Sequence, residues 1–441
     1  MVKEGHLEDM SVFSNFPLYF HIDSLGLIFA TLTLVIFLLS GMFQMEYMKG
    51  EKHIVSYGIF YVLSMTVEIL LCFAGNMITF YMCFELLTLM SMPLVIHERT
   101  KESIMAALKY LFFSLFGAYS ALFGIYILNK YAESLTFTAG GTLSEAVFDA
   151  NSGVLLAAAF MLIVGFGVKA GMWPMHSWLP TAHPVAPAPA SAVLSAVIVK
   201  AGVLGILRSL FYVFDASLLS GSVVSKVWMI LSLLTVFMGS MLAYREPVLK
   251  KRLAYSTVSQ VSYILFGLSV LNPIAMEGAL LHVIGHALIK AGLFLVAGAI
   301  IHNLGVTRVS EMRGVGRRMP VTMICYTLLS LGLIGIPPTG GFISKWYLCI
   351  GALDSDIKIF SVLGPVILLI SALLTAGYLL ELTFIGFFPG DDYVTEPKCE
   401  PKSLMLIPIV ALTLCSVLMG LFPRTLTGLI EQIVYSLLDV I

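Results

Sequence analysis

The sequence predicts an all-α membrane protein of about 12 transmembrane helices, organised as two inverted five-helix repeats that each contain a broken helix. Two observations predict the membrane class: 59% of the 441 residues are hydrophobic and only 12% are charged, and mean hydropathy is +0.96. A soluble domain carries roughly twice that charged fraction. A third observation, the pair of Gly/Pro-interrupted apolar segments described below, predicts the repeats.

A membrane span needs about 20 mainly apolar residues. The apolar segments of that length form a single integral membrane domain over 1–441. The predicted spans are 22–43, 53–73, 75–96, 102–128, 153–182, 188–210, 225–244, 251–270, 274–302, 319–352, 359–388 and 403–422. The segment 425–441 is short and amphipathic, which favours a surface helix, and 129–152 is the longest predicted loop.

Two of the predicted spans are long and interrupted. The span 153–182 contains Gly171-Met172-Trp173-Pro174, and the span 319–352 contains Gly335-Ile336-Pro337-Pro338-Thr339-Gly340-Gly341. Proline removes a backbone donor and clashes with the preceding turn, so we expect each helix to open there.

Lysine and arginine are distributed unevenly over the loops. One alternating set of loops holds fourteen of these residues, and the other set holds six, among them Arg208. The richer set is expected in the cytoplasm. With an even number of spans, both termini are then expected on the outer side of a cell inner or cytoplasmic membrane. The same assignment predicts that the loop 303–318 and the segment 245–252 lie on one side.

Composition also excludes several classes of function. The formal net charge of −1 offers no basic patch for a nucleic acid. The six cysteines form no CxxC pair and fall mostly in apolar runs, where cysteine behaves as a small hydrophobic residue. We therefore expect no disulfide framework, no metal and no cofactor, and any redox chemistry would belong to partner proteins.

Several ionisable residues fall inside the predicted spans. A charge at the centre of a membrane helix costs about 2.5–3.5 kcal/mol even on lenient scales, so such residues normally face a bundle interior or water and mark ion or proton pathways. They are Lys109, Lys169, Lys200, Lys290, Lys345, Glu68, Glu85, Glu381, His282 and His286.

Spacing suggests how some of them act. His282, His286 and Lys290 are four residues apart and therefore lie on one helix face. Imidazole titrates near neutrality and both donates and accepts, which suits a proton relay. A lysine in a dry site can release and rebind a proton, and Glu85 offers a counter-charge that would hold a nearby lysine protonated.

Other members of the set have competing interpretations. Lys109 lies near a helix end and can snorkel to the interface. Glu68 has no evident partner in the sequence, so it is either an interhelical hydrogen bonder or a site that faces another subunit. Glu381 also lies near a helix end. His176 and His183 flank the broken segment, where packing is as good an explanation as proton transfer.

The two broken spans are related by position. They lie five spans apart, and the odd offset means that successive units enter the membrane in opposite directions. Paired interrupted helices in inverted repeats are the best sequence indication of a transporter's midplane site. We therefore expect repeats at about 53–210 and 225–388, flanked by the helices 22–43 and 403–422.

The sequence of the first break resembles a known family. The segment GVKAGMWPMHSWLPTAHP at 167–184, followed by Val199-Lys200-Ala201-Gly202, resembles the core signature of the antiporter-like, proton-translocating subunits. These occur in respiratory complex I, in Mrp-type cation/proton antiporters and in energy-converting membrane-bound hydrogenases. Further matches extend the resemblance over roughly 20–420: Phe84-Glu85, Lys250, the segment RLAYS at 252–256, His286-Ala287, Lys290-Ala291, Leu293-Phe294, Gly335-Ile336-Pro337-Pro338, Gly341-Phe342 and Lys345.

The resemblance implies roles for the buried residues. Glu85 and Lys169 would form the family's carboxylate–lysine pair, and Lys200 would be its connecting lysine. His282, His286 and Lys290 would form the central relay, and Lys345 would occupy the broken-helix position where some relatives carry glutamate. Family members commonly have about fourteen core helices, so this chain would lack the first two, which affects how it docks against neighbouring subunits.

The leading functional hypothesis is an ion-translocating subunit (H⁺ or Na⁺/H⁺) of a multisubunit redox-driven complex, which would be NADH dehydrogenase-like or hydrogenase-like and would have its redox centres elsewhere. Its partners would be homologous antiporter-like and small membrane subunits, a peripheral redox module and the lipid bilayer. The first alternative is a subunit of a gradient-driven cation/proton antiporter. The second is a structural membrane subunit without transport.

Overall fold

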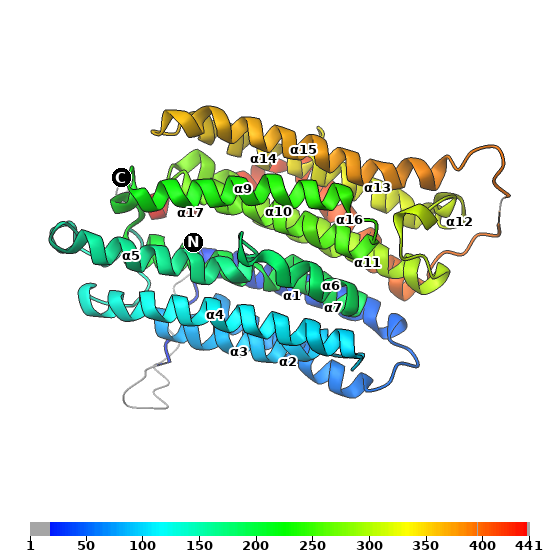
Figure 1. The fold of residues 1–441 in the computed structure, drawn as a ribbon, viewed down its shortest axis with the longest axis horizontal. Coiled ribbons are helices and arrows are strands. Elements are labelled where there is room, and N and C mark those ends of the chain that lie inside the picture. The colour runs from blue at the N-terminus through cyan, green and yellow to red at the C-terminus, as the bar shows by residue number, and fades with distance from the viewer. Residues whose placement is uncertain (1–17, 395, 439–441) are drawn as a thin grey trace.

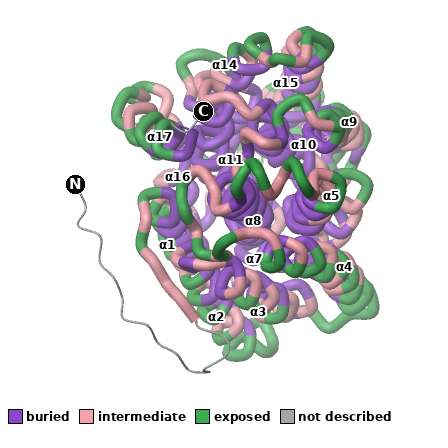
Figure 2. Tube along the Cα trace, turned by 90° about the vertical axis from the view of Figure 1, so that its left-hand side faces the viewer, coloured by how far each residue is buried: buried purple, intermediate pink, exposed green. Residues whose placement is uncertain are grey.

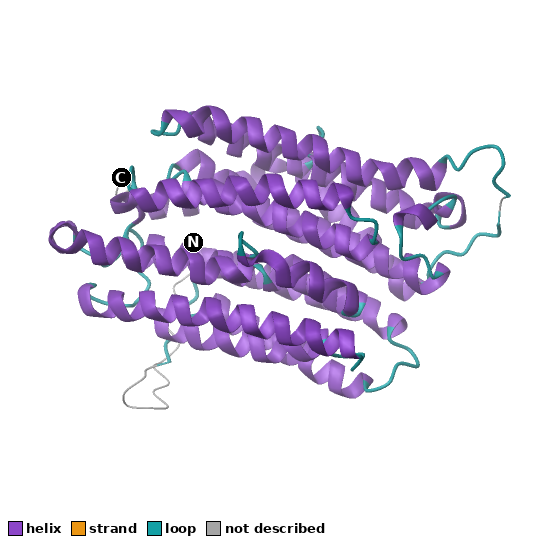
Figure 3. Ribbon diagram, in the orientation of Figure 1, coloured by secondary structure: helices purple, strands orange, loops and turns teal. Residues whose placement is uncertain are grey.

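The computed structural model describes residues 18–394 and 396–438. Over these residues the chain folds into long helices joined by short loops, and only isolated β-bridges occur (Figure 3). This confirms the predicted all-α class.

The first half of the bundle contains the elements that precede residue 220. They are α1 (Ser24–Tyr47), α2 (Ile54–Cys72), α3 (Met77–Val95), α4 (Lys101–Tyr131), α5 (Glu145–Ala170), the 3₁₀ helix η1 (Met175–Trp178), α6 (Leu179–Val185), α7 (Ala188–Val193), the π-helical turn η2 (Leu194–Ile198), α8 (Lys200–Ser209), a second π-helical turn η3 (Leu210–Phe214) and the 3₁₀ helix η4 (Ala216–Leu219).

The second half completes the bundle (Figure 1). It comprises α9 (Val223–Arg245), α10 (Leu249–Ser269), α11 (Pro273–Leu304), the 3₁₀ helix η5 (Val309–Glu311), α12 (Val315–Arg318), α13 (Pro320–Ile334), α14 (Gly340–Leu353), α15 (Lys358–Phe387), α16 (Ser403–Leu421) and α17 (Pro423–Leu438).

Helix occupies each of the twelve predicted spans, but within the described residues ten helical segments are long and apolar enough to cross a membrane by themselves. Two predicted spans fall outside this group. The helix α10 buries many serine and threonine side chains, which lowers its hydropathy. The span 319–352 is divided into α13 and α14, and each part is too short alone.

Both predicted interruptions are present. The helix α5 ends at Ala170, with Gly171 in the left-handed region at φ +78. The helix α13 ends at Ile334, with Gly335 at φ +89, and α14 begins at Gly340. Glycine adopts this conformation without a Cβ penalty, which is why each helix ends at that residue.

Two predictions of local structure met different outcomes. The predicted loop 129–152 is wrong in its bounds, because α4 continues to Tyr131 and α5 begins at Glu145. The C-terminal surface helix is confirmed as α17 for the part that the structure describes. Its apolar side, which includes Ile430, Ile433 and Val434, packs inward.

Burial distinguishes central helices from peripheral ones. In the most apolar 18-residue stretch of each helix, 100% of the residues are buried in the α7–α8 segment and 94% in α11. In α15 the share is only 28%. Viewed along the bundle, α8, α10 and α11 lie in the middle, and exposed residues collect on the outer helices (Figure 2). A central helix can therefore carry charged side chains that never meet lipid.

One end of the bundle carries most of the basic residues and is called the basic end below. Leu249 N donates to Thr307 O at 2.9 Å and Val309 N to Pro247 O at 2.9 Å. The prediction that 303–318 and 245–252 share one side is thus confirmed. The C-terminal end of α1 lies there too, because the Tyr47 ring contacts His302 at 5.5 Å and Glu46 pairs with Lys402 at 2.6 Å.

The close packing at the second break leads to a prediction. A Cβ at Gly341 would overlap the carbonyl oxygen of Gly332 on α13. We expect Gly341→Ala to destabilise the protein by about 1–3 kcal/mol, the usual result of overpacking. The control is Gly58→Ala on α2, where a Cβ would meet nothing within 4 Å. Thermal unfolding in detergent measures both, and equal melting temperatures would contradict this account of the break.

Candidate functional site

Lys200 lies at the centre of the buried polar groups. It is the first residue of α8 and follows the π-helical turn η2, a local widening that often marks functional sites. Its Nζ donates to Ser195 O at 2.8 Å and lies 2.7 Å from His286 Nδ1 on α11. The chain therefore brings an amine and an imidazole into direct hydrogen-bonding contact inside the bundle.

The contact continues along α11. The rings of His286 and His282 stack one turn apart, with centroids 6.0 Å from each other. His282 Nδ1 is 2.9 Å from Ser344 Oγ, and its ring also stacks on Tyr263 at 5.5 Å. The Nε2 atoms of both histidines are buried and make no hydrogen bond with the described residues.

Lys345 follows Ser344 in the second turn of α14, beside the second break. Its Nζ donates to Leu333 O at 2.7 Å and to Ile334 O at 3.0 Å, which are carbonyls of the last turn of α13. A cation at this position is stabilised by the helix dipole and by carbonyls that lack a partner within the helix. The same Nζ lies 4.9 Å from the centroid of the Tyr263 ring, so Lys345 and His282 share one aromatic neighbour.

Lys169 lies in the last turn of α5, immediately before the first break. Its Nζ donates to Thr88 Oγ1 at 2.9 Å and to Tyr110 OH at 2.5 Å. Tyr110 OH in turn lies 2.7 Å from Ser91 Oγ. The amine thus bonds to neutral hydroxyls from α3 and α4.

The expectation of a direct pair between Glu85 and Lys169 is wrong. Neither an ion pair nor a hydrogen bond joins these two residues. Glu85 is half-buried and accepts a hydrogen bond from Tyr81 OH at 3.3 Å. Lys169 Nζ instead reaches Thr88, which lies one turn further along α3 from Glu85. The two residues interact through their charges at a longer distance.

Glu68 on α2 is the carboxylate that the interior places near two lysines. It is 3% exposed, and its charge interacts with those of Lys169 and Lys200. Its Oε2 makes no hydrogen bond with the described residues. No partner for Glu68 was evident from the sequence because the charges it interacts with, Lys169 on α5 and Lys200 on α8, lie 101 and 132 residues further along the chain.

Lys290 and His183 form a separate part of the interior. Lys290 Nζ donates to Leu253 O at 2.9 Å and makes no hydrogen bond with His286, so the predicted three-residue stripe is continuous only over its two histidines. His183 stacks on Phe294 at 4.7 Å, and its charge would interact with that of Lys290. Neither ring nitrogen of His183 has a partner among the described residues.

The remaining candidates lie nearer the surface of the bundle. Lys109 Nζ donates to Thr181 Oγ1 at 3.0 Å and therefore contacts the broken segment instead of snorkelling. His176 is half-exposed beside that break. Glu381 pairs with Arg252 at 2.7 Å, where it serves the structure of the basic end.

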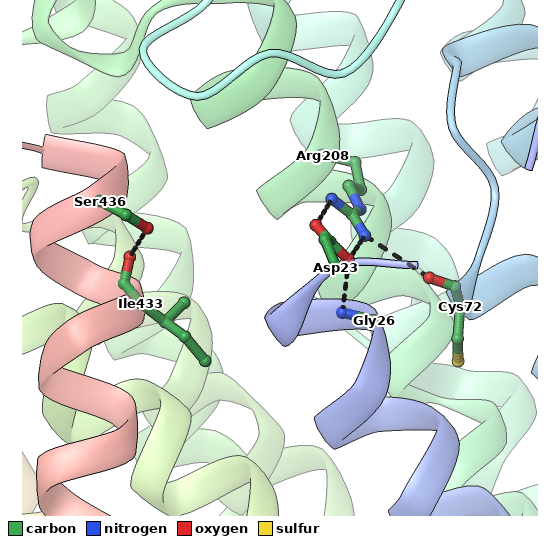
Figure 4. A network of polar contacts seen from close by, with 6 residues as sticks. All are labelled: Asp23, Gly26, Cys72, Arg208, Ile433 and Ser436. Atoms are coloured by element: carbon green, nitrogen blue, oxygen red, sulfur yellow. Dashed lines mark hydrogen bonds and ion pairs between the residues drawn. The ribbon is translucent and has the colours of Figure 1, made fainter. Parts of the chain in front are cut away.

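A buried ion pair was not predicted from the sequence, because Arg208 was counted as a loop residue on the outer side. Arg208 lies within α8 and is 2% exposed. It donates to both carboxylate oxygens of Asp23, at 2.5 and 2.7 Å, and Asp23 also caps α1 by accepting from Gly26 N (Figure 4). The available signal was the spacing of eight residues from Lys200, which places both side chains on one face of α8.

The buried amines share one property, which is that their hydrogen-bond acceptors are neutral. Carbonyl, hydroxyl or imidazole groups bind the Nζ atoms of Lys169, Lys200, Lys290 and Lys345. Within 18–394 and 396–438, no three His, Cys, Asp or Glu side chains gather as metal ligands would. These geometries define a polytopic membrane protein with a chain of ionisable groups buried in its interior.

Comparison with known proteins identifies the family. Residues 74–375 match the family described as "NADH:quinone oxidoreductase/Mrp antiporter, TM". The chain is 34% identical to NADH-quinone oxidoreductase subunit N of Desulforudis audaxviator over 82% of this chain and 73% of that protein. It therefore belongs to the antiporter-like membrane subunits of complex I, membrane-bound hydrogenases and Mrp antiporters.

Other relatives cover each branch of that family. Hydrogenase-4 component B of Escherichia coli is 30% identical over 94% of this chain and 64% of its own length. A Na(+)/H(+) antiporter subunit of Bacillus subtilis is 28% identical over 83% of this chain and 72% of its own length. The fold resembles a chain of the archaeal membrane-bound sulfane sulfur reductase, with a TM-score of 0.85 at 22% identity over 98% of this chain and 86% of that chain.

The Asp23–Arg208 pair leads to a prediction. Removing one partner of a buried pair leaves an uncompensated charge and costs about 3–5 kcal/mol. We expect Asp23→Asn to lower the melting temperature clearly. The control is Asp392→Asn, which breaks the exposed pair with Arg313 and should leave the melting temperature unchanged.

The pH dependence of this effect has a definite sign. Burial raises the pKa of Asp23, but the hydrogen bonds and charge of Arg208 and the Gly26 N–H outweigh it, so the pKa lies below 3.8. A carboxylate with a depressed pKa stabilises the fold above its unfolded pKa and loses that contribution as the pH falls through its folded pKa. The difference between wild type and Asp23→Asn should therefore be complete at neutral pH and shrink below about pH 4. A difference that grows on acidification would contradict this role.

Proposed function

We propose that this protein moves protons across the membrane through its buried Glu, Lys and His side chains, as an ion-translocating subunit of a multisubunit redox-driven complex. The observation that supports it most is the 2.7 Å contact between Lys200 Nζ and His286 Nδ1. Proton transfer between side chains requires this distance or one bridging water.

The chemistry of the relay follows from the two groups in contact. An ammonium at Lys200 can give its proton to Nδ1 of a neutral His286, and the imidazole can then release a proton from Nε2. Because Nε2 of His286 and Nε2 of His282 have no protein partner among the described residues, water can bridge them. From His282 the hydrogen bond to Ser344 Oγ leads towards Lys345, the next residue, and a bridging water would complete this step. The Tyr263 ring touches His282 and Lys345 only through its face, and its OH donates to Leu368 O.

The other end of the relay contains Lys169. The charges of Glu68 on α2 and Glu85 on α3 both interact with the charge of Lys169. Carboxylates favour the charged form of a nearby amine and lose that influence when they are protonated. We infer that the protonation of these carboxylates controls whether Lys169 holds its proton. Lys290, Lys109, His176 and His183 are proposed as secondary members, because each lies within or beside this interior.

The energy source is also part of the proposal. The relative at 34% identity is named as a subunit of an oxidoreductase, which supports a peripheral redox module as partner. Relatives at 30% identity include both a hydrogenase component and a Na(+)/H(+) antiporter subunit. A gradient-driven antiporter is the alternative, and mass spectrometry of copurifying proteins distinguishes the two.

The orientation rests on the basic end. The concentration of arginine and lysine near 245–252 and 303–318 favours a cytoplasmic location for this end, by the positive-inside rule. The N-terminal end of α1 and the C-terminal end of α16 lie at the opposite end of the bundle. Both chain termini are therefore proposed to face outward.

The proposal predicts a loss of transport for Lys200→Met. Removing a proton-transfer group typically costs about 10²–10⁴-fold in rate, so proton uptake into inverted vesicles should fall to background. The control is Lys226→Met, an exposed lysine in the first turn of α9, which should transport like wild type. Native gels check assembly, and normal pumping by an assembled Lys200→Met complex would exclude the relay.

The second break offers an informative pair of variants. Lys345→Glu retains an ionisable group where some relatives carry glutamate, so it is expected to keep part of the activity, whereas Lys345→Ala should lose it. Similar activity in both variants would mean that titration at this position is unimportant.

The first half of the relay is tested by Glu85→Gln and Lys169→Ala. Each change removes one member of a charged set that interacts across the interior, so each should depress translocation strongly while assembly persists. Full pumping by an assembled Glu85→Gln complex would assign Glu85 a structural role.

A further inference from the structure

The buried face of α2 is polar along most of its length. Tyr57, Tyr61, Ser64 and Glu68 recur at helical spacing and all face the bundle, whereas apolar residues such as Val55 and Val62 face outward. A membrane helix gains nothing from burying hydroxyls where leucine would pack, and unsatisfied buried polar groups cost free energy. The stripe therefore requires a reason other than packing.

The stripe begins at a cavity on the basic end. This cavity of about 150 Å³ is lined by His53, Ser56, Tyr57, Phe60, Pro93, Ile96, His97 and Arg99. His53 and Arg99 are exposed and Tyr57 is buried, so the cavity leads from the surface to the first hydroxyl of the stripe. The His97 ring contacts the Tyr57 ring at 5.0 Å. Burial lowers the pKa of His97, as do the charges of His53 and Arg99, while Glu51 raises it.

The groups along the stripe leave hydrogen-bonding capacity unused. Tyr61 OH donates to Phe37 O at 2.8 Å, and Ser40 of α1 lies beside it. Within the described residues, Tyr57 OH, Ser40 Oγ and Glu68 Oε2 are buried and make no hydrogen bond of normal geometry. Buried polar atoms are nearly always satisfied, by water where protein offers no partner. Tyr57 OH also faces the backbone of Ala190 on α7, and Ser40 Oγ faces Tyr61. Three such atoms along the inner face of α2 indicate a hydrated column.

The column is long enough to reach from the basic end to the middle of the membrane. Tyr57 and Glu68 are eleven residues apart, a rise of about 16 Å along a helix. This is roughly half of the ~30 Å hydrocarbon thickness. The column therefore extends from the basic surface to the depth at which the Glu68 charge interacts with Lys169 and Lys200.

We propose that this α1–α2 column is the path by which protons reach the relay from the basic end, and that Glu68 is the group that receives them. The inference rests on the proposed function and adds its access route. A hydroxyl or water accepts a proton on its oxygen and releases the one it carried. At the end, an O–H bond forms on the Glu68 carboxylate as the donor's O–H bond breaks, and the neutral amine of Lys169 or Lys200 then takes that proton.

The experiment uses the assembled complex in inverted vesicles, whose exterior corresponds to the basic end in the proposed orientation. Glu68→Gln keeps the size of the side chain and removes its proton-accepting carboxylate. We expect uptake to fall about tenfold or more, and Glu68→Asp to restore part of it. Ser64→Val places methyl groups in the column. Ser64 Oγ donates to Phe60 O at 2.7 Å, so the change removes only a bond within α2. The control is Ser232→Val on α9, a buried serine outside the column.

The pH profile separates a blocked path from a damaged fold. When access limits the rate, uptake by Ser64→Val should recover as the external proton concentration rises, and Ser232→Val should follow the wild-type profile. Loss of activity in Ser64→Val by the same factor at every pH, with Glu68→Gln active, would overturn the path.

Lys200→Met in the same vesicles separates the two proposals. If Lys200→Met is inactive while Glu68→Gln and Ser64→Val pump like wild type, the column is excluded and the relay stands. If Lys200→Met pumps normally, the relay itself fails.

Discussion

The interior of this protein depends on the way in which buried ammonium groups are satisfied without adjacent carboxylates. Lys200 donates to a carbonyl of the π-helical turn η2, Lys290 to a carbonyl in the second turn of α10, and Lys345 to two carbonyls at the end of α13. A charged amine in a dry interior is costly unless its protons are bound. The breaks and the π-helical turn are the places where helices present carbonyls or bend side chains towards them.

This mode of binding suits a group that changes its protonation state. A lysine bound to a carboxylate leaves an unpaired negative charge behind when it loses its proton, whereas a lysine bound to carbonyls, hydroxyls and imidazole leaves only neutral partners. The Asp23–Arg208 pair illustrates the opposite case. Its guanidinium remains charged at all accessible pH values and its bidentate geometry fixes α8 to α1. One helix thus carries a permanent cation at one end and a labile one at the other.

The carboxylates are placed at a distance from these amines, and this affects how the site can be controlled. Glu68 interacts with Lys169 and Lys200 through charge instead of contact, so its protonation can alter both lysines at once. Glu85 lies further out, bonded to Tyr81, on a helix whose other face is exposed.

The sequence by itself determined the class of the fold, the two breaks and the set of buried ionisable residues. Hydropathy and the Gly/Pro interruptions act locally, and an intramembrane lysine is expensive wherever its neighbours lie. Tertiary structure alone decided which groups meet. Lys169 reaches Thr88 and Tyr110 instead of Glu85, and Lys200 reaches His286 across 86 residues of chain. Arg208 was misassigned because hydropathy places an arginine near a span end in solvent, whereas a carboxylate from 185 residues away holds it inside.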